Sequence, residues 1–173
     1  MKNLLPLIFL LVVPFLSQAQ QSDPSTLHKT GDNVPAFTFS IDKDKAASIT
    51  DYRGKIVLIN FFATWCGPCR MELPRVQKEI WEKYKDNPHF AMFVFGREQD
   101  WNIVLPFKAE NNYTFPILPD VGRKIFSLFA TQAIPRSILI DEQGKIIYQS
   151  IGYSPEEFND LLAVLASRLN KSI

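Results

Sequence analysis

A pair of cysteines directly after a buried-strand pattern is the feature that most constrains the fold. Residues 55–62 form a nearly continuous apolar run, typical of a central strand covered on both faces. Cys66 and Cys69, the only cysteines in the chain, follow, and apolar residues then recur at helical spacing up to Tyr84. Three-residue spacing on a first helical turn brings two sulfurs close enough to form a small, reactive disulfide. The sequence therefore predicts a redox centre at a strand-to-helix junction.

A metal site, a haem attachment site and a structural bridge each fit the cysteine pair less well. A zinc site needs four ligands, and the only histidines, His28 and His89, lack metal-ligand spacing and nearby cysteines. Covalent haem attachment needs a histidine directly after the second cysteine, where this chain has Arg70. A purely structural bridge across two residues would constrain little of the unfolded chain. We therefore expect neither a metal nor a cofactor.

The N-terminus has the pattern of a secretory signal peptide. Lys2 precedes thirteen largely apolar residues, 4–16, and Ser17 and Ala19 lie at the positions that a signal peptidase reads. The alternative, a transmembrane anchor, needs roughly 20 apolar residues. We expect residues 1–19 to be cleaved, which would leave a soluble, exported, periplasmic protein.

The rest of the chain divides into a leader and one domain. Residues 20–30 are polar and aperiodic, so we expect a flexible leader there and a single domain over 31–173. Removal of Lys2 leaves 18 basic and 18 acidic residues, and this balance gives no pull toward nucleic acid or an anionic membrane. Neither is expected as a partner.

Hydrophobic periodicity predicts an α/β domain. A β-hairpin is expected from 37–41 and 47–50, a second buried strand at 90–95, a late hairpin from 137–141 and 145–150, and helices within 100–112, 121–129 (N-capped by Asp120) and 158–169. A kink is expected at Pro74. Early strand–helix alternation favours parallel pairing and the late hairpin favours antiparallel pairing, which together give a mixed central β-sheet flanked by helices.

The residues around the two sulfurs have distinct expected roles. A helix that starts at Cys66 would place this sulfur beside unpaired backbone N–H groups, which favour the thiolate, so Cys66 is the expected nucleophile. Cys69, one turn further in, is the expected resolving thiol. Pro68 suits the first helical turn, Gly67 allows a partner chain to approach closely, and Trp65 is either a surface lip or plain packing.

These motifs resemble the thioredoxin superfamily. The resemblance rests on Trp65-Cys-Gly-Pro-Cys69 at a strand-to-helix turn and on Ile134-Pro135 before a later strand, and it covers residues 33–169. The 31–37 entry, the 51–55 turn and the 60–65 run are similar to the TlpA-like, ResA-like branch of exported thiol–disulfide oxidoreductases. The resemblance implies a thioredoxin-like fold with an added N-terminal β-hairpin.

Further site residues follow from this resemblance. It implies a cis peptide bond before Pro135, which would pack on the disulfide and leave the Ile134 backbone free to pair with substrate. Asn60 stands where thioredoxins have a buried Asp and cannot accept a proton. Glu72 matches a glutamate of the exported branch and is either a proton acceptor or a solvated surface carboxylate. Arg136 either reaches the sulfurs and stabilises the Cys66 thiolate, or points outward to acidic partners.

The sequence favours one function and leaves two alternatives open. The favoured function is reduction of disulfides in exported protein substrates, with a membrane electron carrier as the source of electrons. A peroxiredoxin-like peroxidase would need Thr or Ser where the chain has Ala63. A thioredoxin-like peptide-binding or chaperone module would use the Pro135 edge without redox chemistry.

Overall fold

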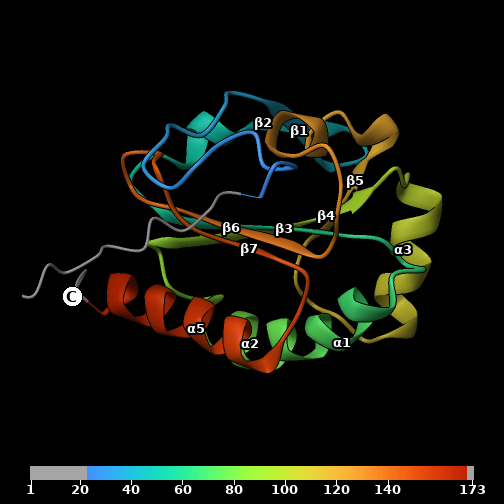
Figure 1. Cartoon of the computed structure of the whole chain (residues 1–173). Helices are drawn as coiled ribbons and strands as arrows, with labels where there is room; N and C mark the ends of the chain where they lie inside the picture. The colour runs from blue at the N-terminus through green and yellow to red at the C-terminus, as the bar shows by residue number, and fades with distance from the viewer. Residues whose placement is uncertain (1–22, 171–173) are drawn as a thin grey trace, which may run out of the picture.

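The computed structural model describes residues 23–170 and has a five-stranded sheet at its centre (Figure 1). The strands, in the spatial order β5-β4-β3-β6-β7, are β5 (Ile117–Asp120), β4 (Phe90–Arg97), β3 (Ile56–Phe62), β6 (Arg136–Ile140) and β7 (Ile146–Ile151). Strands β3, β4 and β5 are parallel, whereas β6 and β7 are antiparallel to their neighbours. The predicted mixed sheet is confirmed.

Helices and a hairpin cover the two faces of this sheet. One face carries α1 (Gly67–Arg75), the π-helical stretch η2 (Val76–Trp81), α2 (Glu82–Tyr84) and α5 (Pro155–Leu169), with α3 (Trp101–Glu110) near the β5 edge (Figure 1). The other face carries the predicted hairpin of β1 (Thr38–Asp42) and β2 (Lys45–Ser48), followed by the 3-10 helix η1 (Ile49–Tyr52), and also the 3-10 helix η3 (Val121–Arg123) and α4 (Phe126–Phe129). No helix among residues 23–170 is long and apolar enough to cross a membrane.

Strand β3 joins two separate apolar clusters. Alternate side chains point to opposite faces of a strand, so Leu58 and Phe62 pack under the α1–α5 layer while Ile59 and Phe61 pack under the hairpin layer. All residues of β3 are buried, as expected for a central strand. The strand therefore delivers the following turn, with its two cysteines, to a fixed position at the carboxyl end of the sheet.

Two features of the fold correct the sequence-based expectations. Residues 23–30, expected within a flexible leader, are hydrogen-bonded to the domain: Thr26 forms a β-bridge with Ala130, and the Leu27 N–H donates to Phe129 O. This part of the expected leader is therefore held on the domain, ahead of the expected domain start near Gly31. The edge strand β5 was not predicted, because Pro119 argues against a strand. An edge position tolerates proline, since one side of the strand needs no ladder partner.

The helix predicted over 121–129 is broken into two short pieces. Gly122 and Arg123 have φ values of 65° and 51°, in the left-handed region, which ends the first piece after one turn. The Asp120 carboxylate accepts from the N–H groups of Ile125 and Phe126, at 2.8 and 2.9 Å, and so caps α4 instead of the 121–129 helix. In contrast, the helix predicted within 100–112 forms despite Pro106.

The helix after the cysteines continues past its proline. Pro74 lies within α1, and the π-helical pattern of η2 begins two residues later. A proline removes one backbone donor, so a change of hydrogen-bonding pattern close to Pro74 is consistent with the expected disturbance.

Candidate active site

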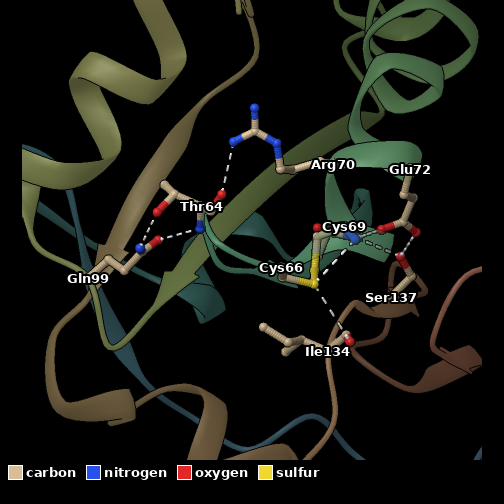
Figure 2. Close-up of a disulfide and its surroundings, with 9 residues drawn as sticks. Thr64, Cys66, Cys69, Arg70, Glu72, Gln99, Ile134 and Ser137 are labelled. Atoms are coloured by element: carbon tan, nitrogen blue, oxygen red, sulfur yellow. Dashed lines mark hydrogen bonds between the residues drawn. A yellow bond between two sulfur atoms is a disulfide. The ribbon is translucent and has the colours of Figure 1, made fainter. Parts of the chain in front are cut away.

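Cys66 and Cys69 form a disulfide at the start of α1 (Figure 2). Cys66 is the N-cap residue of the helix, and its Sγ accepts from the Cys69 N–H at 3.2 Å. Cys66 is 5% exposed and Cys69 is fully buried, so an incoming group reaches the Cys66 sulfur first. Pro68 occupies the first helical turn, as predicted. A reduced Cys66 would be stabilised as thiolate by this N–H group and by the positive end of the helix dipole.

An exposed rim surrounds the disulfide. Trp65 is 68% exposed, so it is a surface lip rather than part of the core, and Gly67 and Pro68 are also exposed. Met71, one turn along α1, is 64% exposed and was not predicted. Large apolar side chains that remain exposed beside a reactive group provide a surface on which a partner can dock.

The loop before β6 brings a backbone carbonyl to the sulfurs. The Ile134–Pro135 peptide bond is cis, as the resemblance implied, and Pro135 is buried. The Ile134 oxygen lies 3.9 Å from Cys66 Sγ (Figure 2), so a reduced Cys66 thiol could donate to it. The carbonyl of Pro135 is already used, since it accepts from the Gly152 N–H at 2.8 Å.

Glu72 is buried beneath the cysteine turn. Its side chain is on α1, one turn beyond Cys69, and only 2% of the residue is exposed. The interpretation as a solvated surface carboxylate is therefore wrong. Burial raises the pKa of Glu72 to about 7, although hydrogen bonds from Asn60 and Ser137 oppose this shift. A carboxyl group with this pKa can both accept and release a proton near neutral pH.

Two further buried polar residues hold this carboxyl group. Asn60 on β3 donates through Nδ2 to Glu72 Oε2 at 2.9 Å and to Ser137 Oγ at 3.0 Å. Ser137 on β6 donates to Glu72 Oε1 at 3.3 Å. From the sequence, Asn60 was noted only because it cannot accept a proton, and Ser137 was not identified as a site residue. The available signal was a polar residue at an interior position of each of two apolar strands.

Arg136 reaches neither the sulfurs nor the solvent. Its side chain is fully buried, and its guanidinium donates to Ser25 Oγ, Thr26 Oγ1 and Gln132 O at 2.9, 2.8 and 3.1 Å. Both expectations for this residue are therefore wrong. Because Ser137 points to the α1 face, the preceding side chain on the strand points to the other face, where residues 23–28 lie.

The turn that precedes Cys66 is held by a glutamine from another loop. Gln99 Nε2 donates to Thr64 Oγ1 at 2.7 Å, and Gln99 Oε1 accepts from the Thr64 N–H at 3.1 Å (Figure 2). Arg70 donates to the carbonyl of Thr64 at 3.1 Å and lies over the Phe107 ring. Sequence reasoning missed Gln99 and Thr64 because neither carries a motif.

The fold and the site together define a thiol–disulfide oxidoreductase of the thioredoxin superfamily: a disulfide at a strand-to-helix junction, beside a cis-proline loop, on a mixed sheet. The Redoxin family model matches residues 29–165, and the chain belongs to this family.

Similar proteins agree with this assignment and place the chain among ResA-like and TlpA-like proteins. It is 33% identical over 127 residues to the thiol-disulfide oxidoreductase ResA of Bacillus thuringiensis (strain Al Hakam), covering 73% of this chain and 72% of that protein. A solution structure from Bacteroides thetaiotaomicron, described as a candidate protein disulfide isomerase, has 35% identity and a TM-score of 0.80 and covers 84% of this chain and 93% of that one. The crystal structure of StoA from Bacillus subtilis has 25% identity and a TM-score of 0.62, with coverage of 76% and 99%.

Proposed function

We propose that this thiol–disulfide oxidoreductase works as a reductant, with Cys66 as the attacking thiolate, Cys69 as the resolving thiol and Glu72 as the proton acceptor. The observation that carries the proposal is the buried Glu72 carboxyl group, with its pKa near 7, on the helix that begins with the two cysteines. A solvent-exposed carboxylate would stay ionised at neutral pH and would be hydrated by water, whereas Glu72 receives hydrogen bonds from Asn60 and Ser137.

The reaction balances without a cofactor. The Cys66 thiolate attacks one sulfur of a substrate disulfide, which forms a mixed disulfide and expels the other substrate sulfur as a thiolate. Glu72 takes the proton from Cys69, and the Cys69 thiolate attacks Cys66, which forms the internal disulfide and releases the second substrate thiolate. Two electrons pass to the substrate. An external dithiol carrier must then reduce the Cys66–Cys69 disulfide.

The rim residues are the proposed docking surface. Trp65, Gly67 and Pro68 are exposed on one side of the disulfide. The Ile134–Pro135 loop lies on the other side, where the backbone can pair with an extended substrate segment. Disulfide-bearing proteins fit such a surface. For an exported protein, the electrons would come from a membrane electron carrier.

The proposed direction of electron flow is inferred from the Gly67–Pro68 dipeptide, which resembles that of thioredoxins with a low reduction potential. We expect a reduction potential of about −270 mV in defined thiol buffers, as in thioredoxin. A potential of about −120 mV would identify an oxidant instead.

The role of Glu72 is tested by the Glu72→Gln variant in single-turnover reduction of a protein disulfide. General-base catalysis contributes at least about 100-fold, so we expect the mixed disulfide to resolve roughly 100-fold more slowly. The inflection near pH 7 in the resolution rate should also disappear. Glu110→Gln, at an exposed position of α3, is the matched control. Equal rates and equal pH profiles in wild type and Glu72→Gln would refute the assignment.

The proposal that the protein is exported rests on the signal-peptide pattern at 1–19, which lies outside the described residues. Expression with the native N-terminus in a bacterial host should give a periplasmic protein whose mass corresponds to a start at Gln20. A cytoplasmic protein of full-length mass would rule export out.

A further inference from the structure

Arg136 is an anomaly in the core. It is a fully buried cation whose hydrogen bonds, within residues 23–170, all go to uncharged oxygens. Its Nε has no hydrogen-bond partner among these residues. The nearby charge is the Asp23 carboxylate, which accepts from the same Ser25 hydroxyl and attracts Arg136 electrostatically from beyond it. Burial of a charge without a direct ion-pair partner costs stability, so an apolar side chain would be expected here unless the guanidinium does something that an apolar group cannot.

The oxygens that Arg136 binds come from two segments far apart in the sequence. One is residues 23–28, which we call the N-terminal strap, and the other is residues 131–135, which we call the docking loop. The strap pairs with the first residue of this loop and with the chain before it: the Thr131 N–H donates to Ser25 O, and the Leu27 N–H donates to Phe129 O, both at 2.9 Å. Arg136 therefore lies where the strap meets the loop.

The docking loop has an unusual backbone. Ala133 has a φ of 70°, in the left-handed region that a residue with a Cβ rarely adopts, and such a conformation persists only where the surroundings impose it. The surroundings here are the bond from Arg136 to Gln132 O directly before Ala133 and the carbonyl of Ile134 against Cys66 Sγ directly after it.

We propose that Arg136 is a positioning residue that uses the N-terminal strap to hold the docking loop in the conformation that receives a protein substrate. Its guanidinium can bond Ser25, Thr26 and Gln132 at once, which an apolar side chain or a single point donor cannot do. The strap thereby becomes part of the substrate-binding apparatus, although it lies more than 100 residues from Pro135 in sequence. The inference extends the proposed docking role of the Ile134–Pro135 loop and rests on it.

A purely structural role for Arg136 would have a different signature from a positioning role. Loss of stability alone would change the reactions with all disulfides by the same factor, through the fraction of folded protein. Loss of loop position would affect substrates that pair with the loop, while a small disulfide that only meets Cys66 would react as before. The ratio of the two rate constants separates these possibilities.

The test compares insulin with oxidised glutathione in single-turnover reactions of the pre-reduced full chain, followed by tryptophan fluorescence. Arg136→Met and the double variant Ser25→Ala/Thr26→Val remove the two sides of the contact. We expect the second-order rate constant for insulin to fall roughly tenfold, since a displaced binding element can cost up to about 100-fold. The insulin concentration that gives half of the limiting rate should rise, while the limiting rate at saturating insulin should stay the same. With glutathione, we expect a change of less than twofold.

Ala133→Val serves if the other variants fold poorly, because Ala133 is exposed and the change removes no buried contact. A β-branched residue disfavours a φ of 70° more strongly than alanine does, so the loop should leave this conformation and the same selective loss is expected in a stable protein. Arg75→Met is the matched control. It removes an arginine at the end of α1 that stacks on Phe158 and pairs with Glu79 in η2, and it should lower stability without changing the insulin-to-glutathione ratio.

Each result decides one question. An insulin-to-glutathione ratio that is unchanged in Arg136→Met, the double variant and Ala133→Val would overturn the positioning role, as would the same change of ratio in Arg75→Met. If the wild-type protein reduced neither insulin nor oxidised glutathione, the proposed function as a reductant would be refuted instead.

Discussion

At the scale of single residues, Glu72 lies in a buried position that the sequence did not determine. The sequence left it between a proton acceptor and a surface carboxylate, because its neighbours in the chain do not determine which side of α1 meets the sheet. The contacts with Asn60 on β3 and Ser137 on β6 join three elements and leave Glu72 2% exposed. A short motif cannot encode such a long-range polar cluster, but the two cysteines could be assigned from their spacing alone.

Burial of Glu72 predicts a pH dependence of stability. Its pKa is raised to about 7 in the folded protein, against 4.5 for an unperturbed carboxyl group. The unfolded chain therefore releases this proton first as pH rises, and the folded state loses relative stability between about pH 4.5 and pH 7. The stability present below pH 4.5 should fall by about 3 kcal/mol across this range.

The measurement is urea unfolding of the oxidised protein at several pH values between 4.5 and 8. Burial also raises the pKa of Asp120, so the difference between wild type and Glu72→Gln is the informative quantity. We expect this difference to change steadily up to pH 7 and then to level off. A difference that is constant with pH would show that Glu72 does not titrate in this range.

At the scale of elements, the active-site turn is held by the loop that follows the neighbouring strand β4. Gln99 follows β4 and binds both the N–H and the hydroxyl of Thr64, two residues before Cys66. The Gln99 carbonyl also accepts from the Asp120 N–H at the end of β5. The position of Cys66 thus depends on the ends of three parallel strands, which meet at one edge of the sheet.

This contact predicts an energetic coupling between Gln99 and Thr64. Gln99→Ala should lower the free energy of unfolding by about 1–3 kcal/mol, because it leaves the half-buried Thr64 N–H without its partner. Thr64→Val should cost about 1 kcal/mol, since the N–H bond survives. A double-mutant cycle should then give a coupling of at least about 0.5 kcal/mol. Strict additivity in chemical denaturation would contradict the contact, and Gln143→Ala, at an exposed turn position, is the neutral control.

The elements themselves were largely predictable, and the exceptions have physical causes. The central strand 55–62, the hairpins and the helix that begins after Cys66 follow from periodicity, because burial on one or both faces dictates the pattern. The strap at 23–28 was missed because its polar residues bond to Arg136 and to the backbone rather than to an apolar core. The helix over 121–129 was overpredicted because periodicity does not register the left-handed residues Gly122 and Arg123.

At the scale of the whole molecule, the core and the proposed docking surface use different aromatic residues. The hairpin layer packs on a cluster of phenylalanines, and Phe61 on β3 lies at its centre. Its ring is 5.3 Å from that of Phe126, 5.6 Å from that of Phe129 and 5.7 Å from that of Phe95. Trp65, four residues later, projects from the rim. The same sheet end therefore carries both a core aromatic and an exposed aromatic of the proposed docking surface.

This division predicts opposite effects for two substitutions to alanine. Phe61→Ala should lower the free energy of unfolding by about 3–5 kcal/mol, as expected for a buried phenylalanine that leaves a cavity. Trp65→Ala should change it by no more than about 0.5 kcal/mol, because the side chain is mostly exposed, yet it should weaken saturation by a protein disulfide. Chemical denaturation and single-turnover reduction of insulin measure the two effects. A large loss of stability in Trp65→Ala would mean that Trp65 is part of the core. Unchanged saturation by insulin would mean that Trp65 lies outside the docking surface.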